Sequence, residues 1–210
     1  MARTITRIPA ALFLSLLCAA PAWADPVLDF TGGSRDIVLF DGEVGWEFTV
    51  NSTITVDGLG YFDFDTNGLL ASHVVTLWTL GGTPLVSATV TSASTLVVST
   101  STFGDWLFES IAPLTLAPGS YVIGASQPNS TDNDALFATA VTIPEVTFVR
   151  SRIAIGLGSF PNLLDGAEDG RFGPNLRTGA AVPTPEPSLL ALFATGLAMV
   201  GLARSRRRRS

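Results

Sequence analysis

Hydrophobic and polar residues alternate with a period of two through most of residues 25–182. In Val44–Val50 the aromatic and aliphatic side chains occupy the even positions, whereas Glu47 and Thr49 occupy odd ones. This alternation predicts a strand with one buried face, and helical periodicity does not persist anywhere in these residues. Further stretches rich in β-branched and aromatic residues are Val74–Leu80, Leu85–Thr91, Leu96–Thr100, Asp105–Ile111, Ser120–Ala125 and Val146–Ile155.

Turn-forming pairs separate these predicted strands at short intervals. They are Asp41-Gly42, Asp57-Gly58, Asn67-Gly68, Gly81-Gly82 and Pro118-Gly119. Many short strands joined by such turns predict an all-β fold, an antiparallel β-sandwich or barrel. Residues 160–179 differ, because they contain two prolines and several glycines, and they predict a long loop that closes one end of the sandwich.

The N-terminal segment has the pattern of an export signal. Arg3 and Arg7 precede an apolar run, and Ala22 and Ala24 supply the small residues that signal peptidase requires. Residues 1–24 are therefore predicted to be a signal peptide that is cut after Ala24. The alternatives are a membrane anchor, for which the apolar run is shorter than the usual span of about 20 residues, and lipidation at Cys18.

Composition narrows the chemistry of the exported part. Cys18 is the only cysteine, so removal of residues 1–24 leaves no disulfide, no Cys-ligated metal and no Cys nucleophile. Lysine is absent, and residues 25–184 hold five arginines against seventeen acidic residues, a formal charge of −12. Such an acidic body repels phosphate backbones, which argues against nucleic acid as a partner.

The C-terminal segment has three parts. Residues 178–187 are small and Pro-rich, and they predict an extended linker. Within residues 188–210, the apolar run Leu189–Ala203 predicts a transmembrane helix of about 22 Å, shorter than the hydrocarbon core of about 30 Å. An arginine cluster follows and would stay on the cytoplasmic side of the membrane. The cluster consists of Arg204, Arg206, Arg207, Arg208 and Arg209.

Pro185, Glu186 and Pro187, followed by the short apolar span and the terminal arginines, closely resemble the PEP-CTERM sorting signal. The resemblance implies recognition by a membrane transpeptidase of the exosortase class, with cleavage near Pro185–Pro187. It also implies a Gram-negative bacterium that makes exopolysaccharide. The alternative is an ordinary single-span anchor.

The body, from about Gly42 to Asn175, resembles a β-sandwich domain of unknown function that recurs in bacterial exported proteins. This second resemblance implies a jelly-roll-like fold and brings no established activity or catalytic residues. The segments that carry it are Gly45–Val50, Ile54–Val56, Leu59–Asp63, Asn67–Leu69, His73-Val74, Leu77-Trp78, Gly82–Leu85, Ser87–Val90, Pro113–Leu116, Pro118–Gly124 and Phe172–Asn175.

Asp63, Asp65 and Asn67, followed by Gly68, give the best metal signal in the chain. Oxygen ligands at alternate positions before a glycine begin an EF-hand loop. The twelfth position of that loop would be Val74, which lacks a carboxylate, so a full EF-hand is excluded. The hypotheses left are a shallower calcium site completed from elsewhere in the fold and a plain polar turn.

Catalytic patterns are weak. His73 is the only histidine and no nucleophile elbow accompanies it, so a structural hydrogen-bonding role is favoured over a Ser-His-Asp triad. Glu43, Glu47 and Glu109 are the candidate carboxylates for glycoside hydrolysis, and no spacing singles out a pair.

Trp46, Trp78 and Trp106 could stack on sugar rings if they lie on an exposed sheet face. Each lies within a strand pattern, where a core position is the alternative.

The sequence thus predicts a non-enzymatic, exported β-sandwich protein of the cell envelope, outer surface or extracellular matrix, held transiently at the inner membrane. Its expected partners are an exosortase-class transpeptidase and exopolysaccharide. The predicted parts are a signal peptide (1–24), a β-sandwich domain (25–177), a linker with the Pro-Glu-Pro motif (178–187) and a helix with an Arg-rich tail (188–210). The alternatives are a carbohydrate-binding module, with or without calcium, and a glycan-active enzyme.

Overall fold

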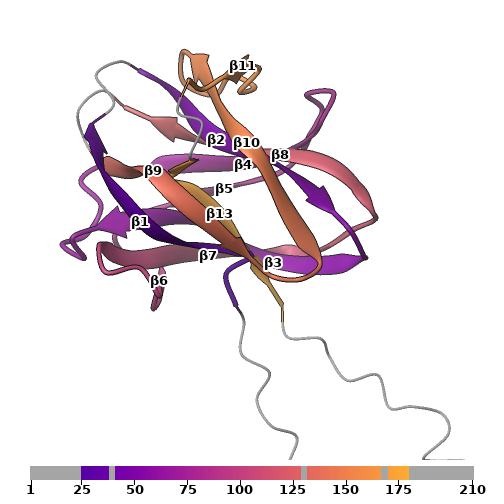
Figure 1. The fold of residues 1–210 in the computed structure, drawn as a ribbon, viewed down its shortest axis with the longest axis horizontal. Coiled ribbons are helices and arrows are strands. Elements are labelled where there is room, and N and C mark those ends of the chain that lie inside the picture. The colour runs from indigo at the N-terminus through magenta and orange to yellow at the C-terminus, as the bar shows by residue number, and fades with distance from the viewer. Residues whose placement is uncertain (1–24, 38–40, 129–131, 167–169, 180–210) are drawn as a thin grey trace, which may run out of the picture.

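The computed structural model describes residues 25–37, 41–128, 132–166 and 170–179 (Figure 1). The predicted signal peptide, the Pro-Glu-Pro motif and the C-terminal helix with its arginines lie outside these residues. Within the described residues no helix is long and apolar enough to cross a membrane.

All the described strands belong to three antiparallel sheets. The six-stranded sheet has the order β11 (Leu163–Leu164), β10 (Val146–Ile155), β2 (Gly42–Val50), β8 (Gly119–Gln127), β4 (His73–Thr79) and β5 (Pro84–Val90). The four-stranded sheet has the order β13 (Pro174–Thr178), β3 (Ile54–Phe64), β7 (Gly104–Leu116) and β6 (Thr95–Val97). The three-stranded sheet has the order β1 (Leu28–Ile37), β9 (Asn133–Thr142) and β12 (Arg171–Phe172). The prediction of an all-β fold with antiparallel sheets is therefore confirmed.

One aromatic core joins the three sheets. Phe30 of β1 packs edge-on against Phe62 of β3 at 4.9 Å between ring centroids, and it stacks on Phe172 of β12 at 5.5 Å. Phe62 in turn meets Trp106 of β7 at 4.9 Å. On β2 the even positions are buried, as the alternation predicted, and Phe48 packs against Trp46. The period-two pattern thus places one face of each long strand in a shared core.

Residues 160–179 are not a simple loop, because they contain β11, β12 and β13. Asn175 of β13 is fully buried, and its side-chain amide accepts from Leu28 N at 3.2 Å and donates to Leu28 O at 2.6 Å. Pro174 is tolerated because β13 is an edge strand, where a missing N–H breaks no second ladder. A short edge strand that contains proline gives no alternating pattern, so the sequence predicted a loop here.

The described chain enters and leaves at the same end of the molecule (Figure 1). Val27 N donates to Leu176 O at 2.7 Å, and Thr178 N donates to Asp25 O at 3.0 Å. Pro26 forms an antiparallel bridge with Arg177. The beginning and the end of the described chain are therefore bonded to each other.

Candidate functional site

The largest concentration of buried polar side chains, here called the polar network, consists of Tyr61, His73, Gln127, Asp132, Asp134 and Arg171. His73 begins β4, and its ring stacks on Tyr61 of β3 with centroids 3.7 Å apart and planes 7° apart. Its Nδ1 lies 2.8 Å from the backbone oxygen of Ser126, and its Nε2 lies 3.0 Å from Oδ2 of Asp132. Both ring nitrogens are therefore engaged, one with a backbone carbonyl and one with a carboxylate.

Asp132 is held in its charged form. Burial acts to raise its pKa, but hydrogen bonds from His73 and from the backbone N–H groups of Leu70 and Ala71 lower the pKa below its usual value. The pair therefore fixes the Leu70-Ala71 turn against the start of β9.

This geometry leaves His73 without the free nitrogen that a general base needs. The hydroxyl of Ser126 accepts from Val74 N at 2.7 Å and does not face the ring. A triad requires a nucleophile hydrogen-bonded to an unprotonated imidazole nitrogen. The arrangement fits the structural role that the sequence favoured for His73.

Tyr61 connects the histidine to a second buried carboxyl group. Gln127 donates from its Nε2 to the backbone oxygen of Asp132, so its Oε1 accepts from the Tyr61 hydroxyl. That hydroxyl also contacts Oδ1 of Asp134 and has only one proton to give. Burial raises the pKa of Asp134 to about 6, so this carboxyl group can supply the second proton.

Arg171 closes the network on the other side. Its guanidinium pairs with Asp36 of β1 and with Asp165, and it lies 3.7 Å from Oδ2 of Asp134. Burial acts to lower the pKa of Arg171, but the surrounding carboxylates raise it above its usual value. The Arg171 N–H donates to Ser151 Oγ on β10 at 2.6 Å, so this residue joins the three-stranded sheet to the six-stranded sheet.

The predicted calcium ligands have protein partners instead. Oδ2 of Asp63 accepts from Gly68 N at 3.0 Å, and the Asp65 carboxylate pairs with the Arg35 guanidinium. Asp65 itself has a left-handed backbone with φ of 71°, which belongs to the turn. Within the described residues no group of three or more His, Cys, Asp or Glu side chains is placed to hold a metal ion. The local geometry favours the polar turn over the calcium site.

A calcium titration checks this interpretation. We expect about 5 mM calcium, above the Kd of weak extracellular sites, to leave the melting temperature unchanged in the wild type and in Asp63→Ala. The measurement is differential scanning calorimetry with calcium and with chelator. A rise in melting temperature that needs Asp63 would restore the calcium hypothesis.

The three tryptophans occupy buried positions, which is the alternative to a sugar-stacking surface. Trp46 and Trp106 are fully buried, and Trp46 Nε1 donates to Pro174 O at 2.8 Å. Trp78 is 5 % exposed because Phe160 packs edge-on against it at 5.9 Å. In this structure none of these rings presents a face to solvent.

The candidate glutamates are not brought together. Glu43 and Glu47 lie four residues apart on β2, about 13 Å along an extended strand, and Glu109 is on the other large sheet. Paired glycosidase carboxylates lie closer, about 5–9.5 Å apart. Glu47 is neutralised by Arg152, 2.6 Å away, and by Arg150 at 3.3 Å.

Glu43 has an environment that the sequence did not reveal. It is 1 % exposed, one carboxyl oxygen accepts from Gly158 N, and the other has no hydrogen-bond partner. Burial raises the pKa of Glu43 to about 8, and the Gly158 N–H offsets only part of that rise. Glu43 lies on the face of β2 opposite Trp46 and Phe48, and the segment after β10 covers it there.

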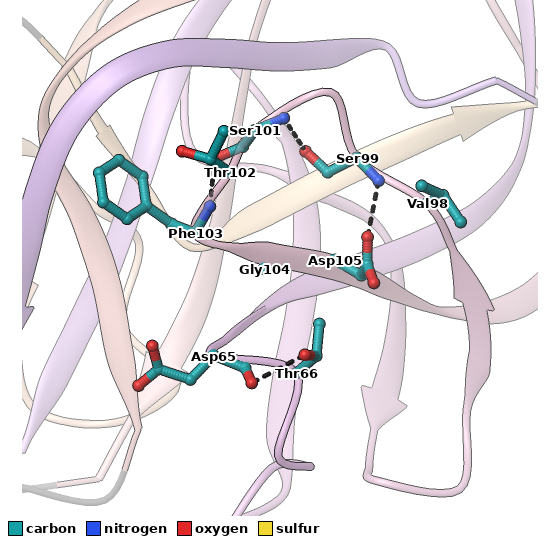
Figure 2. Close-up of a pocket in the computed structure, with 9 residues that line it drawn as sticks. All are labelled: Asp65, Thr66, Val98, Ser99, Ser101, Thr102, Phe103, Gly104 and Asp105. Carbon is teal, nitrogen blue, oxygen red and sulfur yellow. Dashed lines mark hydrogen bonds between the residues drawn. The ribbon is translucent and has the colours of Figure 1, made fainter.

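One depression on the described surface is shallow, with a volume of about 480 Å³ (Figure 2). Figure 2 shows that its polar groups bond to one another, since Ser99 N donates to Asp105 Oδ1 at 2.9 Å and Ser101 N donates to Ser99 Oγ at 2.9 Å. These hydrogen bonds stabilise the loop between β6 and β7, so few of the polar groups in the depression are left to bind a ligand. The lining residues are Asp65, Thr66, Val98, Ser99, Ser101, Thr102, Phe103, Gly104 and Asp105.

Comparisons of the chain with protein-family models, with curated proteins and with solved structures found no match.

Proposed function

We propose that this chain is an exported, non-enzymatic structural or interaction protein of the cell envelope or extracellular matrix. In this proposal a jelly-roll-like sandwich is delivered by the N-terminal signal and sorted by the PEP-CTERM-type tail. The nested pairing of β2 with β8 and of β3 with β7 in separate sheets supports the jelly-roll-like arrangement.

The observation that carries the proposal is the position of the two chain ends. The chain enters the body at Asp25 and leaves it at Gly179 close by, since Thr178 N bonds to Asp25 O. Export and sorting segments attached at one end leave the rest of the sandwich free to face away from the membrane. This arrangement suits a β-sandwich that a transpeptidase transfers through its C-terminal segment, because the rest of the sandwich is not in the way of that step.

The polar network supports a structural role. A chain without cysteine after export cannot use disulfides to hold its sheets together. Here His73, Asp132 and Arg171 hold segments distant in sequence through charged hydrogen bonds. The polar side chains of this network thus make structural hydrogen bonds within the protein.

The proposed sequence of events begins at the inner membrane. Leu189–Ala203 holds the chain there, with the Arg204–Arg209 segment on the cytoplasmic side. An exosortase-class transpeptidase then cleaves near Pro185–Pro187 and transfers the body to the outer surface or to the exopolysaccharide matrix. Calcium has no assigned part in this proposal, and buried Trp46, Trp78 and Trp106 give no support to the carbohydrate-binding alternative.

Replacement of Pro185, Glu186 and Pro187 by alanine tests the sorting step. We expect the variant to accumulate at the inner membrane with its tail attached, whereas the wild type reaches the outer surface or the medium. The measurement is immunoblotting of separated inner-membrane, outer-membrane and medium fractions. Glu145→Ala, which changes one acid in the body, is the matched control, and identical fractionation of all three proteins would refute the proposal.

A further inference from the structure

An uncharged surface lies along one edge of the sandwich. The sequence contains no Asp, Glu, Lys or Arg between Asp65 and Asp105, although residues 25–184 carry a formal charge of −12. This uncharged run forms β4, β5 and β6, and β5 is the last strand of its sheet. The β5 edge, meaning Pro84–Val90, is therefore an edge strand without charged side chains.

The other described edge strands either carry charged side chains, which oppose edge-to-edge pairing, or are very short. β1 carries Asp29, Arg35 and Asp36, and β13 carries Arg177. β12, β11 and β6 have only two, two and three residues. Charges and short lengths normally prevent strands from pairing edge to edge. Among the described edge strands, β5 has seven residues and no charged side chain. The one residue in it that opposes edge-to-edge pairing is Pro84, at its start.

The direction of the backbone groups on β5 follows from its neighbour. Val74 of β4 faces Thr89 across the ladder, and Val74 N donates to Ser126 Oγ on β8, away from β5. In an antiparallel pair, opposite residues direct their N–H and C=O groups either both toward each other or both away. Thr89 therefore directs its N–H and C=O outward, and Ser87 does the same two residues earlier.

The side chains along β5 leave this edge open. Leu85 is 40 % exposed, and Ser87 and Thr89 are exposed as well. The hydroxyl of Ser87 is bonded to that of Thr76 at 2.8 Å on the sheet face, not across the edge. Beyond the end of β5, the Glu109 carboxylate accepts from Ser94 Oγ in the following turn at 3.1 Å.

We propose that a second copy of this chain pairs with the β5 edge through its own β5, so that the two six-stranded sheets become continuous. The edge offers no charge with which a charged partner could pair, so the equally uncharged β5 of a second copy fits it without leaving a charge unpaired. Two acidic bodies also approach each other at least cost along an uncharged edge. The outward N–H and C=O groups of Ser87 and Thr89 supply the hydrogen bonds of the new ladder. The interaction goes beyond the proposed function and does not depend on the sorting step.

Thr89→Pro tests this pairing with little effect on the fold. Proline removes an N–H that points away from β4, so the β4–β5 ladder keeps its hydrogen bonds. Sedimentation of the full chain in density-matched nonionic detergent should give a wild-type dimer, twice the chain mass of 22.0 kDa. In Thr89→Pro we expect the dissociation constant to rise about tenfold or more, with the melting temperature lowered by less than about 4 °C.

A pair of lysine variants distinguishes a charge placed on the β5 edge from the same change in net charge elsewhere on the chain. Thr89→Lys and Thr115→Lys each add one positive charge to an acidic chain, but Thr115 is an exposed residue of β7 in the other large sheet. We expect Thr89→Lys to abolish the dimer, because it places a lysine on the pairing edge of both copies, as natural edge strands do to prevent pairing, and Thr115→Lys to preserve it. Higher salt should strengthen the wild-type dimer, since it screens the repulsion between acidic bodies.

A monomeric wild type would overturn the proposal. So would a dimer that is equally strong in Thr89→Pro and Thr89→Lys, which would place the contact on the tail or elsewhere. Loss of the dimer in Thr115→Lys to the same extent as in Thr89→Lys would also overturn it.

Discussion

Glu43→Gln is expected to make the protein more stable, by an amount that grows with pH. At pH 4 the wild type and the variant should have nearly the same free energy of unfolding. At pH 8 and above the variant should be more stable by about 3–5 kcal/mol. The cause is the burial that raises the pKa of Glu43 to about 8.

The direction follows from proton binding. Between the pKa of an unfolded glutamate, about 4.3, and the folded pKa of Glu43, the folded chain holds a proton that the unfolded chain has released. The wild type therefore loses about 1.4 kcal/mol of stability for each pH unit in this window, and the loss is complete above pH 8. Glutamine cannot ionise, so the variant has no such loss from this position.

Urea unfolding from pH 4 to pH 9 measures the effect. Glu109→Gln is the matched control, because Glu109 is exposed and its carboxylate is bonded by Ser94. We expect the control to differ from the wild type by the same small amount at every pH. A Glu43→Gln difference that is independent of pH would mean that Glu43 is not held protonated.

Arg171→Met should have the largest destabilising effect, about 3–5 kcal/mol at pH 7. Methionine keeps much of the apolar stem and removes the positive charge that faces Asp36, Asp165 and Asp134. The remaining buried carboxylates then lack their counter-charge. The substitution keeps the backbone N–H of residue 171 that donates to Ser151, so the loss comes from the side chain alone.

The deficit of Arg171→Met should shrink as the pH falls from 7 to 4. Without the guanidinium the carboxyl groups bind protons more tightly in the folded state than in the unfolded state, so acid stabilises the variant relative to the wild type. Chemical unfolding at both pH values checks this. Arg150→Met is the control, because Arg150 is 50 % exposed and its pairing with Glu47 is expected to contribute only about 0–1 kcal/mol. Equal losses for the two arginines would contradict the account.

Local alternation predicted much of the fold, because every second side chain of a strand points to the same face and the buried face is therefore apolar at alternate positions. The strand predicted over Val146–Ile155 matches β10, and the even positions of β2 are buried. Strands whose pattern is interrupted were missed. β1 contains adjacent glycines, Gly32 and Gly33, with φ of 65° and 93°, and it therefore lacks a continuous apolar face.

The polar network could not be predicted, because its members come from distant parts of the chain. Tyr61 and His73 lie on strands that follow each other in sequence. Gln127, Asp134 and Arg171 lie on later strands, and only the order of the strands in the folded sheets brings them close. The sequence contains each residue type without any sign that they converge.

Burial on the outer face of the six-stranded sheet was likewise invisible to a local pattern. Glu43 of β2 and Trp78 of β4 lie on this face, where alternation predicts solvent. A segment after β10 covers this face, since Gly158 bonds to Glu43 and Phe160 packs on Trp78. Whether a segment folds back over a sheet depends on tertiary structure and not on the strand beneath it.

The intact mass of the wild-type protein recovered from the outer surface or the medium is the decisive measurement. We expect a chain that begins at Asp25 and ends near Pro185–Pro187, without the Arg204–Arg209 segment. The same cells without their exosortase-class transpeptidase should retain a chain that ends at Ser210. A surface protein that still carries Arg204–Arg209, or the same mass in both cells, would contradict the account.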